Sequence, residues 1–291
     1  MSNFATRILF VVIAVPLLFA TALYVPFMNH LPIALLSLLF TIGSAIEIQR
    51  MIEPGAARTR TAVAAFLGAL PSSATFVARL AWPGASLAVS WLAPVSISAL
   101  VAFLVVSVPI ALPPKTGSSI AESIRKASAN ALYLFYPGIL GSAIIAILGA
   151  PDGAGLMLVW FALLVFGNDS LAWLAGVTLG RRRGIFAVSP NKSLEGLIAG
   201  CAGSIGFAFA GPFLFPSVVP RNWAVLAILG ATCGAAVVIG DLFESALKRA
   251  AGVKDSGSIV PGRGGILDSF DSLLFAAPVF TGILAITGIL A

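Results

Sequence analysis

Carboxylates and a lysine recur at helical spacing at the start of the segment 240–271, which reads GDLFESALKRAAGVKDSGSIVPGRGGILDSFD. If this segment begins as a helix, Asp241, Glu244 and Lys248 share one face with Ser245, because residues three, four and seven positions apart lie on the same side. Carboxylates are the hard oxygen ligands that Mg²⁺ prefers, and a neighbouring lysine can offset phosphate charge. The spacing therefore predicts a charged stripe that emerges from the preceding apolar run.

The second half of the segment combines charges with glycines. Asp268 and Asp271 are three positions apart and share a face at the start of the last apolar run. Lys254 and Arg263 add fixed positive charge beside residues without a Cβ atom, which lets backbone N–H groups approach an anion closely. These residues are Gly252, Gly257, Gly262, Gly264 and Gly265.

Carboxylates, lysines and a glycine-rich loop suit phosphoryl or nucleotidyl transfer. Divalent metal bridges polyphosphate oxygens, and basic side chains offset the charge that develops as pyrophosphate leaves. The segment has neither a Walker A sequence nor a Gly-x-Gly-x-x-Gly pattern after a strand. An ordinary loop with helix-capping aspartates and orientation-setting lysines explains the same composition, so the residues alone leave both interpretations open.

Two blocks of sequence resemble the signature of the phosphatidate cytidylyltransferases, also called CDP-diacylglycerol synthases. The longer block runs from Glu244 to Asp271 and includes ESALKR, KDSG and PGRGGILDSFD. The other contains DSLAWLAG from Asp169 and SPNKSLEG from Ser189, in the same order as in the family. The resemblance covers about residues 165–280, and the N-terminal half agrees only in having several apolar runs.

This resemblance implies an enzyme that converts phosphatidate and CTP into CDP-diacylglycerol and pyrophosphate with Mg²⁺ or Mn²⁺. It implies metal binding by Asp241, Asp268 and Asp271. The catalytic residues that it implies are Asp241, Lys248, Lys254 and Asp268, and the substrate-binding residues are Asp169, Lys192, Glu195, Arg249 and Arg263.

The chain departs from the family pattern at two positions. Arg263 stands where the family usually has His, and Ser269 stands where it usually has Arg. An alternative is therefore a divergent, weakly active member that acts on another lipid phosphate or serves as a lipid-binding membrane protein. A transporter is a further alternative, but its charges would lie at mid-membrane depth in both halves of the chain.

The elements that must position these residues are membrane helices. Of the 291 residues, 59% are hydrophobic and only 10% are charged, and the mean hydropathy is +1.05, which excludes a water-soluble core. Long continuous apolar runs favour helices over a β-barrel. We expect an all-α polytopic bundle of about nine transmembrane helices. The runs are 8–28, 31–49, 61–78, 88–112, 131–149, 154–175, 196–216, 223–240 and 272–290.

The basic residues predict an orientation. With the N-terminus inside, alternation across nine spans places all 17 basic residues except Arg79 and Arg221 on the cytoplasmic side, as the positive-inside rule requires. Seven of the 11 acidic residues lie between 169 and 271 and reach the same side. Carboxylates at bilayer depth are costly, so this convergence suggests a built site, with Asp169 as its member inside an apolar run.

This distribution predicts how the chain is organised. Residues 1–130 are expected to be scaffold helices, with Glu47 as a buried-looking exception, and residues 131–291 are expected to carry a site at the cytoplasmic face of the cell inner membrane. Expected partners are CTP, phosphatidate or a related lipid phosphate, and membrane lipid. A homodimer is left open. The net charge of +6 is assigned to topology and anionic lipid, and no nucleic acid partner is expected.

Overall fold

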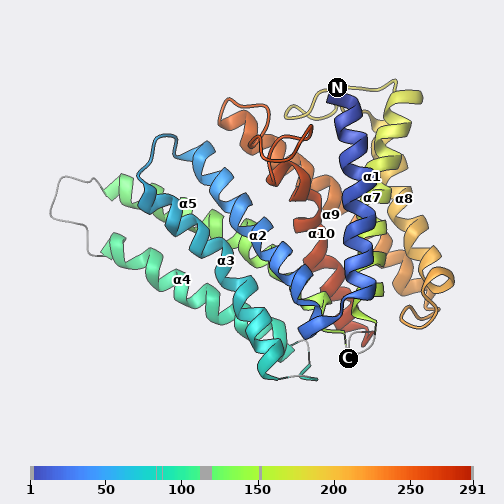
Figure 1. Ribbon diagram of the computed structural model, residues 1–291. Coiled ribbons are helices and arrows are strands. Elements are labelled where there is room, and N and C mark those ends of the chain that lie inside the picture. Colours follow the sequence, from blue (N-terminus) through green and yellow to red (C-terminus); the bar gives the residue numbers. More distant parts are fainter. Residues whose placement is uncertain (1–2, 83, 87, 112–119, 151–152, 290–291) are drawn as a thin grey trace.

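The computed structural model describes residues 3–82, 84–86, 88–111, 120–150 and 153–289, which form a bundle of helices (Figure 1). Lys115, assigned above to the cytoplasmic side, lies outside the described residues. The helices are α1 (Asn3–Tyr24), α2 (Phe27–Ile52), α3 (Arg58–Ala81), η1 (Ala88–Leu92), α4 (Ala93–Ala111), α5 (Ile120–Tyr133), η2 (Leu134–Ile139), α6 (Leu140–Ile147), α7 (Ala154–Thr178), α8 (Leu194–Leu214), α9 (Trp223–Ala250) and α10 (Leu267–Ile286).

The all-α membrane fold is confirmed, and each of the nine apolar runs coincides with a helical segment. Seven of these segments are long and apolar enough to cross a membrane. The other two are α1 and the η1–α4 segment, whose shorter apolar stretches are Val12–Tyr24 and Val89–Leu104. The chain is a multi-pass integral membrane protein.

The segment from α5 to α6 is a single helical stretch of 28 residues that includes the π-helical turn η2. Pro137 lies in this turn and has no N–H to donate, so the regular i to i−4 ladder cannot continue through it. The wider turn places Tyr136 in the interior, where it packs edge-on against Phe243 of α9 and Phe275 of α10. A break in the helix ladder thus brings a tyrosine to the centre of the bundle.

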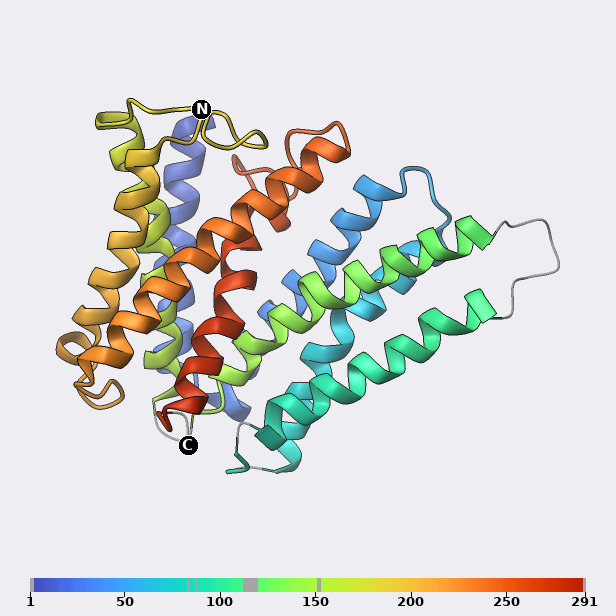
Figure 2. The same cartoon turned by 180° about the vertical axis from the view of Figure 1, so that it is seen from behind.

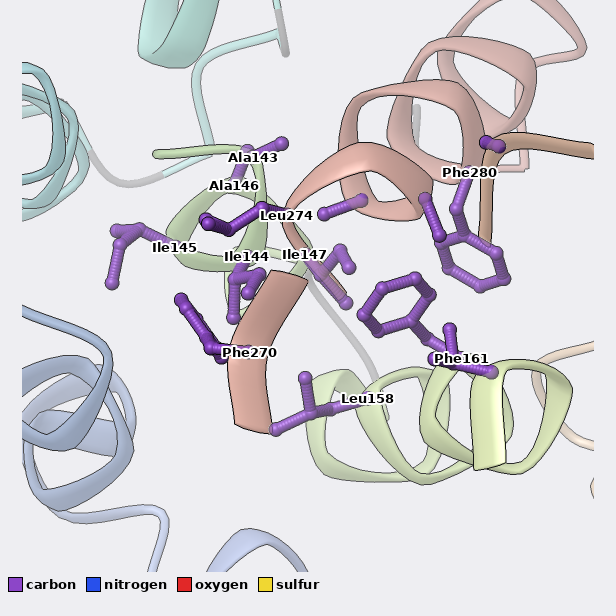
Figure 3. Close-up of a cluster of buried hydrophobic side chains, with 14 of the residues drawn as sticks. Ala143, Ile144, Ile145, Ala146, Ile147, Leu158, Phe161, Phe270, Leu274 and Phe280 are labelled. Carbon is purple, nitrogen blue, oxygen red and sulfur yellow. The ribbon is translucent and has the colours of Figure 1, made fainter. Parts of the chain in front are cut away.

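Helix α10 lies between two groups of helices (Figures 1 and 2). It packs against α9 and α7 on one side and against α6 and α2 on the other. Figure 3 shows the seam, where Ile144 and Ile147 of α6 meet Leu158 and Phe161 of α7 and Phe270, Leu274 and Phe280 of α10. Burial of these side chains fixes the position of α10, which carries two of the predicted site residues.

The termini lie at opposite ends of the bundle (Figure 1), as an odd number of crossings requires. The connections 179–193 and 251–266 lie together at the end that carries the N-terminus, in both views (Figures 1 and 2). Helix α9 continues to Ala250, as the charged stripe predicted, and so carries its acidic residues to this same end. The fold therefore gathers the predicted site residues at one face.

Candidate active site

Three carboxylates from α9 and α10 form a compact acidic group. Asp241, Glu244 and Asp271 each offer one oxygen, and these oxygens all lie within 4.8 Å of one another. Glu244 and Asp271 are buried, whereas Asp241 is partly exposed. The two helices come close because Gly240 has no side chain: a Cβ atom there would lie 2.8 Å from the carbonyl oxygen of Asp271. The helical spacing thus brings the stripe on α9 against the first turns of α10.

Lys248 joins this acidic group to a fourth carboxylate. Its Nζ atom lies 2.5 Å from Glu244 and 2.6 Å from Asp268, and its side chain is 14% exposed. The two carboxylate side chains are 2% and 7% exposed. Buried carboxylates at this spacing repel one another when both are charged, and Lys248, which pairs with both, offsets this repulsion.

Asp268 differs from the other three carboxylates in the number of its protein partners. Its Oδ2 atom accepts hydrogen bonds from the backbone N–H groups of Ser256 and Gly265, both at 2.8 Å, and lies 2.9 Å from the Ser256 hydroxyl oxygen. Its Oδ1 atom accepts from Lys248. The compact acidic group contains Glu244 and not Asp268, and Asp268 contacts the glycine-rich loop from α10. The predicted metal binding by Asp268 stays a prediction.

Backbone N–H groups in the second half of the glycine-rich loop have acceptors within the protein. The N–H groups of Arg263 and Gly264 donate to Val260, and that of Gly265 donates to Asp268. The next two N–H groups, of Ile266 and Leu267, donate to Glu47 of α2. Internal acceptors already use the N–H groups of Gly264 and Gly265, so the expectation that these two amides face an anion is wrong. Phosphate binding at this loop would fall to its side chains.

Lys192 and Asp169, which belong to the other block of the sequence signature, lie close to the acidic group. Lys192 forms an ion pair with Asp241 and lies within electrostatic range of Asp169 and Asp271. Burial lowers the pKa of the Lys192 ammonium, and the neighbouring carboxylates raise the pKa in partial opposition. Asp169 in turn lies within range of Arg263. These residues, which are distant in sequence, therefore form one charged cluster.

Asn168 fixes the position of α7 relative to α8 and α9, next to this cluster. It is 1% exposed, and its Nδ2 atom donates to the Ser204 hydroxyl at 3.0 Å and to the Gly234 carbonyl at 3.4 Å. One amide thus links α7 to α8 and α9. The adjacent residue, Asp169, lies within electrostatic range of Asp271.

Three predicted substrate-binding or catalytic residues lie at the margin of the cluster. Glu195 accepts hydrogen bonds from the N–H groups of Arg181 and Arg182, and so shapes the connection between α7 and α8. Arg249 donates to the carbonyl of Val188 at 3.5 Å. Lys254 is exposed in the glycine-rich loop. Their predicted roles toward substrate stay predictions.

The acidic group fits a hard divalent cation. Glu244 Oε1 is buried without a hydrogen-bond partner among the described residues, and so is the hydroxyl of Tyr136. This hydroxyl lies within electrostatic range of Glu244 and Asp271. Buried polar atoms nearly always have a hydrogen-bond partner. An unpartnered oxygen of Glu244 and an unpartnered Tyr136 hydroxyl at the acidic group therefore indicate a place for a bound polar species.

Sequence reasoning missed Tyr136 and Glu47, and it did not include Glu244 among the site residues. Glu244 had a signal, because it lies three residues after Asp241 on the predicted stripe. Glu47 had a weaker one as an acidic residue within an apolar run. Tyr136 had none, since its position depends on the π-helical turn and on two other helices.

Comparisons with known proteins agree with the resemblance of the two sequence blocks. The cytidylyltransferase family profile matches residues 5–287. The phosphatidate cytidylyltransferase of Bacillus subtilis is 39% identical over 136 residues, which are 46% of this chain and 50% of that protein. That of Thermotoga maritima is 36% identical over 162 residues, 55% of this chain and 59% of that protein. An uncharacterized Escherichia coli protein, YnbB, is 41% identical over 129 residues, 44% of this chain and 42% of that protein.

Proposed function

The chain belongs to the cytidylyltransferase family, and from this premise we propose that it joins CTP and phosphatidate to form CDP-diacylglycerol and pyrophosphate. Its alignments span about half the length of the curated relatives that it matches. The observation that carries the proposal is the convergence of Asp241, Glu244 and Asp271 with Lys192 and Lys248 at one end of the bundle. Such a site suits a polyphosphate held beside a membrane lipid.

Asp241, Glu244 and Asp271 would hold Mg²⁺ or Mn²⁺. A cation bound there would offset the charge of the triphosphate and of the departing pyrophosphate. Asp268 would support this site through Lys248 rather than bind the metal, because its oxygens already accept bonds from Ser256, Gly265 and Lys248. The proposal thus moves one of the expected metal ligands to a supporting role.

The reaction needs positioning and charge stabilisation more than covalent catalysis. A phosphate oxygen of phosphatidate attacks the α-phosphorus of CTP and forms a new phosphorus–oxygen bond. The bond between the α-phosphorus and the oxygen that bridges it to the β-phosphorus breaks, and pyrophosphate leaves with that oxygen. Lys192, Lys254 and Arg263 would bind the phosphates and offset the negative charge that gathers on the leaving group. Lys192 is suited to this role because it is partly buried among carboxylates beside Asp169.

The test is an assay of the purified full chain with radiolabelled CTP and phosphatidate, run with and without Mg²⁺. We expect labelled CDP-diacylglycerol and an equal amount of pyrophosphate only when metal and both substrates are present. Lysophosphatidate, diacylglycerol and polyprenyl phosphate serve as other acceptors in parallel reactions. Absence of product with phosphatidate, or a higher rate with one of the other acceptors, would contradict the proposed substrate.

Substitutions of Arg263 test what the departure from the family pattern at this position does to the reaction. A guanidinium remains charged at working pH, so Arg263 can bind phosphate but cannot act as an acid or a base. We expect Arg263→Ala to lower turnover about tenfold and to raise the KM for CTP, and we expect Arg263→Lys to retain part of the activity. Steady-state kinetics across the pH range measure this. If Arg263→Ala matches the unsubstituted chain at every pH, the arginine is only solvated and Lys254 must serve the loop alone.

The site is proposed to face the cytoplasm from the inner membrane, since the alternation of spans predicts a cytoplasmic position for all 17 basic residues except Arg79 and Arg221, and CTP is a cytosolic nucleotide. In this arrangement residues 131–291 carry the chemistry and residues 1–130 support them.

Single cysteines at Ser189 and Ser258 should react in intact cells only with membrane-permeant maleimides. Labelling of either by an impermeant maleimide before lysis would reverse the orientation.

A further inference from the structure

Glu47 of α2 is a buried carboxylate that contacts the glycine-rich loop from the other half of the chain. Its side chain is 2% exposed. Oε1 accepts a hydrogen bond from the N–H of Ile266 at 2.9 Å, and Oε2 accepts from the N–H of Leu267 and from the hydroxyl of Ser256, both at 2.8 Å. Three donors more than 200 positions away in sequence therefore converge on one carboxylate.

These contacts explain how a carboxylate can be buried within an apolar helix. The first N–H groups of a helix have no partner inside it, and its N-terminus carries partial positive charge, so a negative charge at this end of α10 is favourable. The loop is shaped to admit the carboxylate. A Cβ atom at Gly257 or Gly265 would collide with the Glu47 oxygens. Glu47 thus caps α10 from another helix.

The same contacts connect Glu47 to the acidic group. The Ser256 hydroxyl lies between Glu47 and Asp268, at 2.8 Å and 2.9 Å from their oxygens. Asp268 pairs with Lys248, which pairs with Glu244. Glu47 accepts a hydrogen bond from the N–H of Leu267 at the start of α10, and Asp271 lies one turn further along the same helix. Two routes, one through side chains and one through the backbone of α10, lead from Glu47 to the candidate metal ligands.

We propose that Glu47 is a positioning residue for the metal site: it fixes the start of α10 and the glycine-rich loop so that Asp271 and Glu244 converge with Asp241. The proposal rests on the proposed function for the identity of the site. It assigns to the N-terminal helices a part in positioning the metal site. The division expected at residue 130 then separates two groups of helices but does not bound the site.

Glu53 provides a matched control on the same helix end. It is also buried, at 7% exposure, and it also satisfies its carboxylate with three donors, two from Arg60 and one from the Tyr133 hydroxyl at 3.0 Å. These partners belong to α3 and α5. Loss of charge at Glu53 should therefore disturb the packing of the N-terminal helices without moving α10.

The experiment measures Mn²⁺ binding to the full chain in lipid nanodiscs by the paramagnetic resonance signal of free Mn²⁺, without CTP or phosphatidate. We expect Glu47→Gln to weaken Mn²⁺ binding about tenfold, because charge-assisted hydrogen bonds hold the loop. Glu53→Gln should change Mn²⁺ binding by less than about twofold, even if it lowers thermal stability. In the CTP assay, Glu47→Gln should raise the Mg²⁺ concentration for half-maximal rate by a similar factor, and Glu47→Asp should restore part of the affinity.

Ser256→Ala keeps the proposal testable if Glu47→Gln does not fold, because it removes one link and leaves Glu47 on the α10 amides. We expect it to weaken Mn²⁺ binding about threefold. Equal Mn²⁺ affinity in Glu47→Gln and the unsubstituted chain, or equal losses in Glu47→Gln and Glu53→Gln, would reduce Glu47 to a packing role. If the chain binds Mn²⁺ with these differences but forms no CDP-diacylglycerol, the proposed function fails and the positioning role of Glu47 stands.

Discussion

Asp241→Asn is expected to lower turnover of CTP with phosphatidate by at least about a hundredfold, because a neutral amide is a poor ligand for a hard cation. Protein abundance should barely change. Asp241 is the partly exposed member of the acidic group, and its partner Lys192 has a side chain 29% exposed, so water can solvate the ammonium when the carboxylate is lost. The effect should therefore be on chemistry rather than on folding.

The measurement compares turnover across a range of Mg²⁺ concentrations with the amount of chain in the membrane. Glu122→Gln is the control, since it makes the same carboxylate-to-amide change in an exposed pair with Lys126 on α5. That variant should retain nearly full activity. If Asp241→Asn turns over substrate normally, with an unchanged metal requirement, Asp241 does not bind the metal and the acidic group must be assigned to structure.

The local part of the site could be predicted from sequence because it depends on helix periodicity alone. Asp241, Glu244 and Lys248 lie on one face wherever the segment is helical, and the apolar run before them predicts a helix. The nine apolar runs predicted the helical segments for the same reason, since burial in lipid demands continuous apolar sequence. These statements need no knowledge of how helices pack against one another.

The partners of the charged residues could not be predicted, because they come from elements distant in sequence. Nothing local indicates that Asp268 accepts hydrogen bonds from Ser256 and Gly265 or that Glu47 uses the first N–H groups of α10. The glycine-rich loop had been expected to offer its N–H groups to phosphate. Gly257, Gly264 and Gly265 instead leave space for the carboxylates of Glu47 and Asp268, which accept several N–H groups at the end of the loop, and composition does not reveal this.

Lys248 is predicted to be the residue on which stability of this site depends most. In Lys248→Met, Glu244 and Asp268 remain buried without a cation between them, and loss of one member of a buried ion pair costs about 3–5 kcal/mol. We expect a lower unfolding temperature for the full chain in detergent and a loss of nearly all turnover. Asp268→Asn should destabilise less, because Lys248 keeps Glu244 as a partner.

The double variant Lys248→Met/Asp268→Asn separates the charge effect from packing. It removes the ammonium and one of the two carboxylates, so Glu244 is the one carboxyl group of this pair that remains. Its loss of stability should fall short of the sum of the two single losses by about 0.5–3 kcal/mol, the range found for directly interacting residues. Turnover should not recover, since neither Lys248 nor the Asp268 carboxylate would remain to support the acidic group. Additive losses would mean that Lys248 and Asp268 do not interact, and the support of the acidic group would then have to come from Glu47 and the α10 backbone alone.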